Sequence, residues 1–129
     1  MTSCQKMRPG ATVYAGKQGF SYVEGISKER MGAQGLCMHL LTIPPGGRAK
    51  AHKHATHETA IYALSGTSAV FHGAHLEHHE TVAPGDFFYI PADVPHLPYN
   101  PSGTEPAVAL GFVDSQDSSL GRGVIRGCF

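Results

Sequence analysis

Two stretches decide how this chain folds: Gly46 to Glu58, GGRAKAHKHATHE, and Gly85 to Asn100, GDFFYIPADVPHLPYN. In the first stretch His52 and His54 are two residues apart, so on an extended strand both imidazoles point to the same face and can meet at one metal ion. The second stretch supplies a further histidine, His96. Two histidines at this spacing are a weak signal alone, and it is the combination of the two stretches that is specific.

The segments around these stretches are short and apolar and are separated by glycine and proline, which indicates an all-β sandwich or barrel. The 129 residues include 16 Gly and 9 Pro, and turns such as Pro44 to Gly47 supply the backbone angles that tight connections need. Residues 27–34 are expected to form one helical turn or a loop. The predicted strands are 12–14, 20–24, 36–43, 59–65, 68–72, 80–82, 86–90, 96–100 and 107–113.

The charge balance argues against several classes of partner. Ten Lys and Arg offset ten Asp and Glu, and only 16% of residues are charged, so nucleic acids and anionic membrane surfaces have little to attract them. No apolar run is long enough to span a membrane, and the first ten residues lack the apolar core of a signal peptide, so we expect a cytoplasmic protein. The three cysteines, Cys4, Cys37 and Cys128, are far apart and indicate reduced thiols.

The organisation expected is one domain over residues 1–113, followed by a polar tail over residues 114–129. The tail breaks the strand pattern, and it predicts either a mobile extension or a strand donated to a partner copy.

The spacing of the two stretches resembles the two motifs of the cupin superfamily. The patterns are Gly46-x5-His52-x-His54-x3-Glu58 and Gly85-x5-Pro91-x-Asp93-x2-His96-x3-Asn100. The resemblance covers residues 36–113 and implies a double-stranded β-helix, a small jelly-roll barrel with a metal ion in its mouth. His52, His54 and His96 match three of the family's ligands directly. The second motif departs at Asp93, where the family usually has glycine, and Asp tolerates left-handed turn geometry.

The fourth ligand in that family is a glutamate, and here two alternatives stay open. Counted forward from His54, Glu58 takes the carboxylate position, but counted back from Gly66 the position is Thr59, which has no carboxylate. Because side chains alternate along a strand, an inward Thr59 would bring His57 inward too. The site would then hold four histidines, His52, His54, His57 and His96. A one-residue bulge would instead turn Glu58 inward and restore the carboxylate.

The remaining histidines are interpreted differently. A cluster around Gly73 and Ala74 indicates a solvated hairpin loop rather than a second metal site; it contains His72, His75, His78 and His79 with Glu77 and Glu80. His39 lies within an alternating strand and is expected to be a hydrogen-bonded residue of the barrel wall.

A site built only from imidazoles is neutral, so a divalent ion in it keeps its full charge toward a substrate and acts as a strong Lewis acid. Zinc is favoured and iron is the alternative, since imidazole binds both. Tyr62 and Tyr99 are the candidate catalytic residues, as hydrogen-bonding or proton-transfer groups. The candidates for a largely apolar cavity lining are Met38, Leu40, Ile61, Phe88, Ile90, Tyr99 and Phe112.

For a small cupin with an apolar pocket, the resemblance implies a small carbonyl-containing or aromatic substrate and a homodimer with a contact around residues 20–23. It favours an enzyme similar to aromatic polyketide cyclases, in which zinc held by histidines organises aldol-type ring closure. The alternatives are an iron-dependent dioxygenase of β-dicarbonyl or aromatic compounds and a non-catalytic cupin that binds a small ligand. A sugar or uronate isomerase or epimerase would need a polar lining that the sequence does not show.

Overall fold

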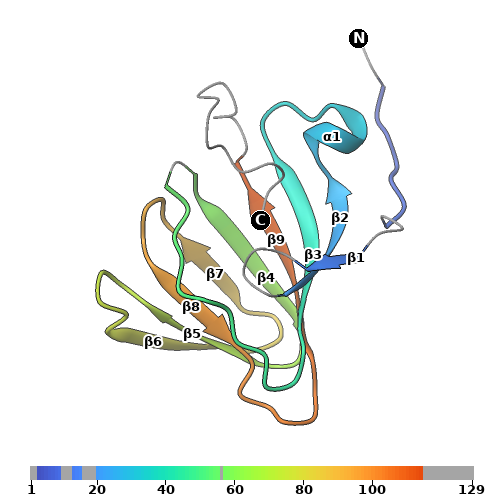
Figure 1. Ribbon diagram of the computed structural model, residues 1–129. Coiled ribbons are helices and arrows are strands. Elements are labelled where there is room, and N and C mark those ends of the chain that lie inside the picture. Colours follow the sequence, from blue (N-terminus) through green and yellow to red (C-terminus); the bar gives the residue numbers. More distant parts are fainter. Residues whose placement is uncertain (1–2, 10–12, 16–19, 56, 115–129) are drawn as a thin grey trace.

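The computed structural model describes residues 3–9, 13–15, 20–55 and 57–114, and these form two antiparallel sheets that face each other (Figure 1). The larger sheet has the order β1-β2-β3-β9-β4-β7, and the smaller has the order β6-β5-β8. The elements are β1 (Val13–Ala15), β2 (Ser21–Ile26), α1 (Lys28–Met31), β3 (Cys37–Ile43), β4 (Thr59–Ser65), β5 (Ser68–His72), β6 (His78–Val82), β7 (Phe87–Ile90), β8 (His96–Tyr99) and β9 (Ala107–Val113).

The predicted all-β, double-stranded β-helix fold is confirmed, and β4, β5 and β9 have the predicted bounds. Two strands differ by two residues at one end: β2 ends two residues later than predicted, and β6 begins two residues earlier because His78 pairs with His72 of β5. Of the two alternatives for residues 27–34, the helical turn is present as α1, and Ser27 begins it by accepting a hydrogen bond from the Arg30 amide. No helix in the described ranges is long and apolar enough to cross a membrane. The predicted tail lies outside the described residues, apart from Asp114.

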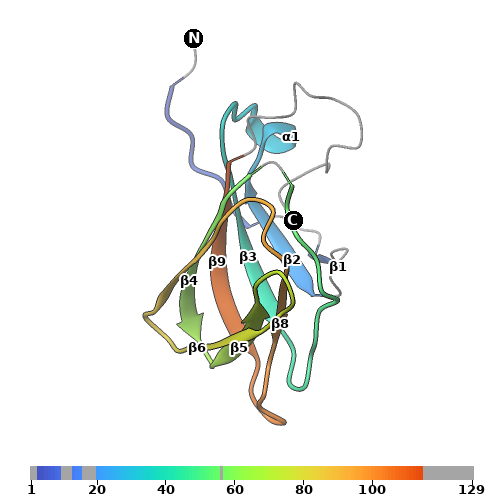
Figure 2. The same ribbon diagram turned by 90° about the vertical axis from the view of Figure 1, so that its left-hand side faces the viewer.

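The long side of the barrel is built by β3 and β9, which pair along seven residues from Cys37 opposite Val113 to Ile43 opposite Ala107 (Figure 2). Their alternating apolar side chains form one core cluster with Phe20 and Tyr22 of the neighbouring segment. Phe20 and Tyr22 are 3% and 2% exposed. Because they are buried inside their own chain, they are not available for the dimer contact predicted around residues 20–23.

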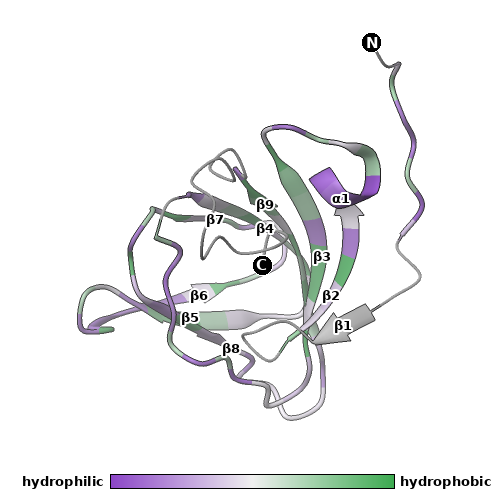
Figure 3. Cartoon of the chain, turned by 45° about the horizontal axis from the view of Figure 1, so that its top comes forward, coloured by the Kyte–Doolittle hydropathy of each residue, from purple (hydrophilic) through white to green (hydrophobic). Residues whose placement is uncertain are grey.

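A second cluster lies between the two sheets, where Ala63 of β4 packs with Val70 of β5, Val82 of β6 and the partly buried Phe88 of β7. Figure 3 shows the two sheets on opposite sides of this interior, with β6 largely hydrophilic and β3, β4 and β9 more hydrophobic. The apolar interior is therefore bounded on one side by a strand that carries polar side chains.

The segment from Gly46 to His54 closes the barrel by lying along β8 and the residues that follow it. Its backbone hydrogen bonds include Ala49 N to Pro98 O at 3.0 Å and Asn100 N to Gly47 O at 2.8 Å. The buried Asn100 side chain fixes the turn, since its Nδ2 donates to Ile43 O and Glu105 O. The segment that carries two of the predicted ligands is thus held as firmly as a strand.

Two cysteines lie among the described residues. Cys4 is exposed and free, but Cys37 is disulfide-bonded, so the prediction of reduced thiols is wrong for Cys37. Sequence spacing does not reveal such a bond, because it depends on which segments the fold brings together.

Candidate metal centre

His52 and His96 face each other across the junction between the closing segment and β8. Their backbones exchange two hydrogen bonds, His52 N to His96 O at 3.0 Å and His96 N to His52 O at 2.8 Å, and their ring centroids are 4.3 Å apart. The Nδ1 atom of each imidazole is hydrogen-bonded to the backbone carbonyl two residues earlier. The distance is 2.7 Å from His52 to Lys50 O and 2.9 Å from His96 to Val94 O. Because a carbonyl only accepts, Nδ1 carries the proton and Nε2 keeps its lone pair for a metal.

His54 completes the triad. Its ring centroid lies 5.3 Å from those of both His52 and His96. The His54 carbonyl accepts a hydrogen bond from Asp93 N at 2.7 Å, and Asp93 has a φ of 66°. The left-handed conformation expected where the family usually has glycine is thus present, and the Asp93 turn helps to hold His54 in place.

The donor atoms of the triad fit a metal ion. One nitrogen from each of the three side chains lies within 4.8 Å of the other two. An ion about 2 Å from each nitrogen therefore requires side-chain shifts on the order of 1 Å. His54 and His96 are 3% and 2% exposed, and Nδ1 of His54 is buried with no hydrogen-bond partner among the described residues. Buried imidazoles without polar partners are costly unless a ligand satisfies them.

Burial keeps these imidazoles neutral. Desolvation is the main cause that lowers the pKa of His54 from 6.5 to about 3, and repulsion from His96, His52 and His57 adds to it. Desolvation likewise lowers the pKa of His96 to about 4, although its hydrogen bond to Val94 opposes the shift. The pKa of His52 is also lowered by burial. The lone pairs that bind a metal are therefore available well below neutral pH.

The two candidates for a fourth ligand point in different directions. Thr59 is 2% exposed and lines the cavity, so of the two alternatives for this strand the one in which Thr59 points inward is present. Glu58 faces the outside, where its Oε2 accepts a hydrogen bond from the Tyr89 hydroxyl at 2.6 Å, so the structure gives the Glu58 alternative no support. The ring centroid of the half-buried His57 lies 5.2 Å from that of His54. His57 as the fourth ligand stays a prediction.

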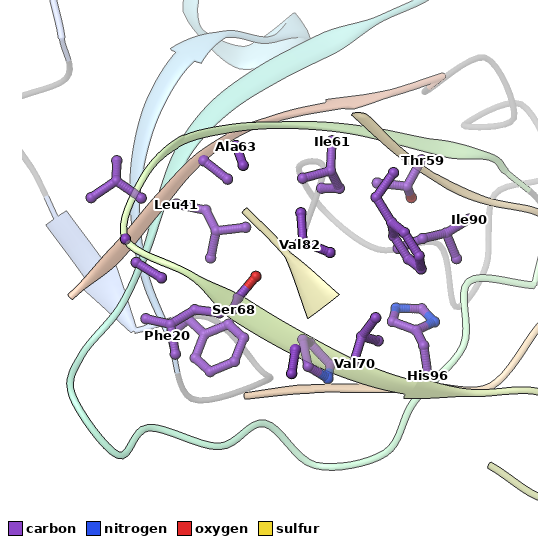
Figure 4. A pocket seen from close by; sticks show the side chains of 18 of the residues that line it. Phe20, Leu41, Thr59, Ile61, Ala63, Ser68, Val70, Val82, Ile90 and His96 are labelled. Carbon is purple, nitrogen blue, oxygen red and sulfur yellow. The ribbon is translucent and has the colours of Figure 1, made fainter. Parts of the chain in front are cut away.

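The triad opens into an apolar cavity between the sheets. Figure 4 shows His96, Thr59 and Ile90 at one end and Phe20 and Ser68 at the other. About 80 Å³ is open to the centres of water molecules, which is room for several waters or a small organic group. The cavity therefore suits a small apolar substrate or the reacting end of a larger one.

Of the residues predicted to line this cavity, Ile61, Phe88 and Ile90 do so. On β3 the lining residues are instead Leu41 and Ile43, since the alternation has the opposite phase from that predicted. The predicted residues Met38, Leu40 and Phe112 are not part of the lining.

The structure does not bring the predicted catalytic tyrosines to the cavity. Tyr62 alternates with the lining residues of β4 and packs against Phe87 at a centroid distance of 4.7 Å. Tyr99 stacks on Phe71 and shares a 2.8 Å hydrogen bond with Nε2 of His79. Both are corrections to the predicted site, because a one-residue change of phase moves a side chain to the other face of a sheet.

The histidines outside the predicted ligand set differ from one another. His39 is 1% exposed and lies edge-on to Tyr22 in the barrel wall. His75 and His79 are exposed, as expected for a solvated hairpin. His72 is not, since it is half-buried on β5 and its alternation with Ser68 and Val70 places it on the inner face. That alternation is readable in the sequence, and it is the signal from which the inward position of His72 could have been predicted.

Comparison with known proteins identifies the family. The model of the Cupin domain matches residues 39–113, and the chain belongs to the cupin family. It is 33% identical over 86 residues to Germin-like protein 3-1 of Oryza sativa subsp. japonica, covering 65% of this chain and 38% of that protein, so the chain spans about two fifths of this relative's length.

Solved structures show the same fold. TT1209 from Thermus thermophilus is similar with a TM-score of 0.62 and 26% identity, covering 74% of this chain and 82% of that one. The polyketide cyclase RemF from Streptomyces resistomycificus is similar with a TM-score of 0.67 and 21% identity, covering 88% and 79%. The chain is therefore a cupin whose histidine triad is suited to a divalent metal.

Proposed function

We propose that this cupin is a metal-dependent enzyme that activates a carbonyl group of a small, largely apolar substrate. The observation that carries the proposal is the triad of His52, His54 and His96, which meets at the end of an apolar cavity. A barrel that only binds an apolar ligand has no need of three convergent neutral imidazoles, because burying such polar groups beside an apolar cavity costs free energy.

A bound divalent ion supplies Lewis acidity, which polarises a carbonyl and favours loss of a proton from the adjacent carbon. The residues of the chain do the rest. The Lys50 and Val94 carbonyls fix the orientation of His52 and His96. The apolar walls, such as Ile61 and Ile90, hold the carbon skeleton and exclude water, which strengthens electrostatic interactions at the triad.

Within this class we favour zinc and an aldol-type ring closure of a polyketide-like substrate. The all-imidazole triad leaves the charge of the ion uncancelled, and the cavity lining is apolar rather than suited to a sugar. The similarity in fold to the polyketide cyclase RemF agrees with this choice. Iron in the same triad would instead direct us to oxygen-consuming cleavage of β-dicarbonyl compounds.

Metal content is the first test. The protein is purified without chelators or metal-affinity resin and analysed by elemental mass spectrometry, together with His96→Ala, His57→Ala and the outward-facing control Glu58→Ala. We expect near-stoichiometric zinc that is lost in His96→Ala and kept in Glu58→Ala, and a reduced content in His57→Ala if His57 is a ligand. A wild-type protein that binds no divalent metal would overturn the proposal.

The reaction is tested with diacetylacetone, a small linear triketone. Its terminal methyl carbon attacks the far carbonyl, a carbon–carbon bond forms, and one water leaves to give orcinol. We expect zinc-loaded protein to form orcinol faster than the His96→Ala variant, as followed by chromatography and mass spectrometry. Zinc binding without turnover of this or longer polyketones would favour the non-catalytic alternative, and oxygen uptake by an iron-loaded protein would favour the dioxygenase.

We also propose that the protein pairs with a second copy through the outer face of β4, β7 and β9. Phe87 is 80% exposed, and Tyr89 and Phe112 are 57% and 38% exposed on the same sheet. Exposed aromatic side chains gathered in this way are typical of interfaces. Sedimentation equilibrium is expected to show a dimer that Phe87→Glu dissociates; a monomeric wild type at tens of micromolar would contradict this.

A further inference from the structure

Four histidines stand in one row across neighbouring strands at the mouth of the barrel. His78 of β6 lies opposite His72 of β5, and His72 lies opposite His96 of β8. His96 in turn lies opposite His52 in the closing segment. Residues directly opposite each other in antiparallel pairs project from the same face, so the row lines the inner side of the sheet. His52 and His96 belong to the triad, while His72 and His78 extend the row toward the edge strand β6.

His72 is the member of this row whose surroundings point to a ligand. Its side chain is 25% exposed, but its Nε2 atom is buried and has no hydrogen-bond partner among the described residues. This nitrogen lies 3.7 Å from Oε2 of Glu80, which is too long for a hydrogen bond. The distance between these two atoms is close to the spacing of about 3.3 Å that separates two ligand atoms when each lies about 2 Å from the same metal ion. Phe88, 5.9 Å away between centroids, limits the freedom of the ring.

Glu80 and His78 share the inner face of β6 with Val82, which lines the cavity, because the three alternate along the strand. The His78 ring centroid is 5.3 Å from that of His72 with the planes inclined by 31°. The His78 side chain is 62% exposed and lies 3.8 Å from a Glu77 oxygen, so it has room to turn toward Glu80. Two imidazoles and one carboxylate can therefore converge at this point.

We propose that His72 and Glu80, completed by His78, form a second divalent-cation site at the mouth of the barrel. The site suits zinc or another ion that accepts imidazole and carboxylate ligands. We expect this second site to bind an ion less tightly than the triad. In the described ranges the triad is the one group with three donor atoms already within 4.8 Å of one another, whereas in the second site two donors are in place and His78 has to turn. It requires no metal in the triad, so the two sites are separable.

The test is a titration of metal-free protein with zinc chloride, followed by calorimetry and by competition with a chromophoric chelator. We expect one tight and one weaker ion per chain. His72→Ala and Glu80→Gln are each expected to weaken the second ion about tenfold or more and to leave the first unchanged. The matched control is His79→Ala, next to Glu80 but bonded to Tyr99 on the opposite face, and it is expected to keep both ions.

One further variant separates the two proposals. His96→Ala is expected to lose the tight ion and to keep the weaker one, because the second site does not use His96. Thermal unfolding of every variant checks that each is folded before its titration is compared. A wild-type protein that binds a single ion, or a second ion that survives both His72→Ala and Glu80→Gln, would overturn the second site while leaving the triad untouched.

Discussion

Acidification of the metal-free protein should destabilise it through the triad itself. In the folded state the pKa of His54 is about 3 and that of His96 is about 4, against 6.5 when the chain is unfolded. As the pH falls below 6.5 the unfolded chain takes up protons that the folded chain refuses, so stability is complete above this pH and is lost as the pH falls toward the folded-state values. Metal-free protein should therefore be markedly less stable at about pH 5 than at about pH 7.

The size of the loss follows from the two pKa values. At about pH 5 both imidazoles remain neutral in the folded state. In the unfolded chain each imidazole is protonated, and because the pH then lies about 1.5 units below the unfolded pKa, this protonation stabilises the unfolded chain by about 2 kcal/mol per imidazole. The two groups together cost about 4 kcal/mol, a large part of the stability of a typical domain. For a chain of this size the unfolding midpoint should fall by about 15 °C. The buried His39, whose pKa is also lowered by desolvation, changes stability in the same direction.

The assay is thermal unfolding followed by circular dichroism between about pH 7 and about pH 5, after removal of metal by dialysis. His54→Gln removes one of these groups, so its loss over this range should be smaller than that of the wild type by about 2 kcal/mol. His75→Gln, which removes an exposed imidazole, serves as the matched control. A wild-type midpoint that stays constant over this range, or a His54→Gln variant with the full wild-type loss, would refute the reasoning.

Three further outcomes are expected. Gly66→Ala should destabilise the fold by about 3 kcal/mol or more in urea unfolding, because φ is +67° and a Cβ would lie 2.1 Å from Pro106 O; an unchanged midpoint would show that this contact relaxes freely. Asn100→Ala should cost about 3 kcal/mol, since it removes hydrogen bonds to Ile43, Glu105 and Ser102 from a buried side chain, and a loss below about 1 kcal/mol would contradict the role given to this side chain. Tyr89→Phe should leave zinc content intact, because the Tyr89 hydroxyl bonds to Glu58 on the outer face of the sheet, away from the triad; loss of zinc would reopen the Glu58 alternative.

Most of the fold could be predicted because its signals are local. Short apolar segments between turns predict strands, and β4, β5 and β9 have the predicted bounds. The three histidines whose donor atoms could hold a metal ion were also within reach of the sequence, because His52 and His54 are two residues apart and His96 stands in the second motif. The left-handed Asp93 was likewise expected from its place in that motif.

The failures concern the face to which a side chain points. The sequence pattern predicts Met38 and Leu40 in the cavity, but Leu41 and Ile43 line it, and Tyr62 and Tyr99 lie outside it. Alternation gives two sets of side chains for each strand, and the sequence alone does not say which set faces inward. That choice depends on how the strand pairs with its neighbours.

The sequence by itself determined the all-β barrel, the three histidines that could hold a metal ion and the apolar character of the interior, because these depend on residue type and on spacing along the chain. The tertiary structure alone decided that Glu58 bonds to Tyr89 on the outside and that His78 and His72 continue the row of His96 and His52. The physical reason is that cross-strand register joins residues far apart in the chain, and register is set by the packing of whole strands rather than by any short stretch.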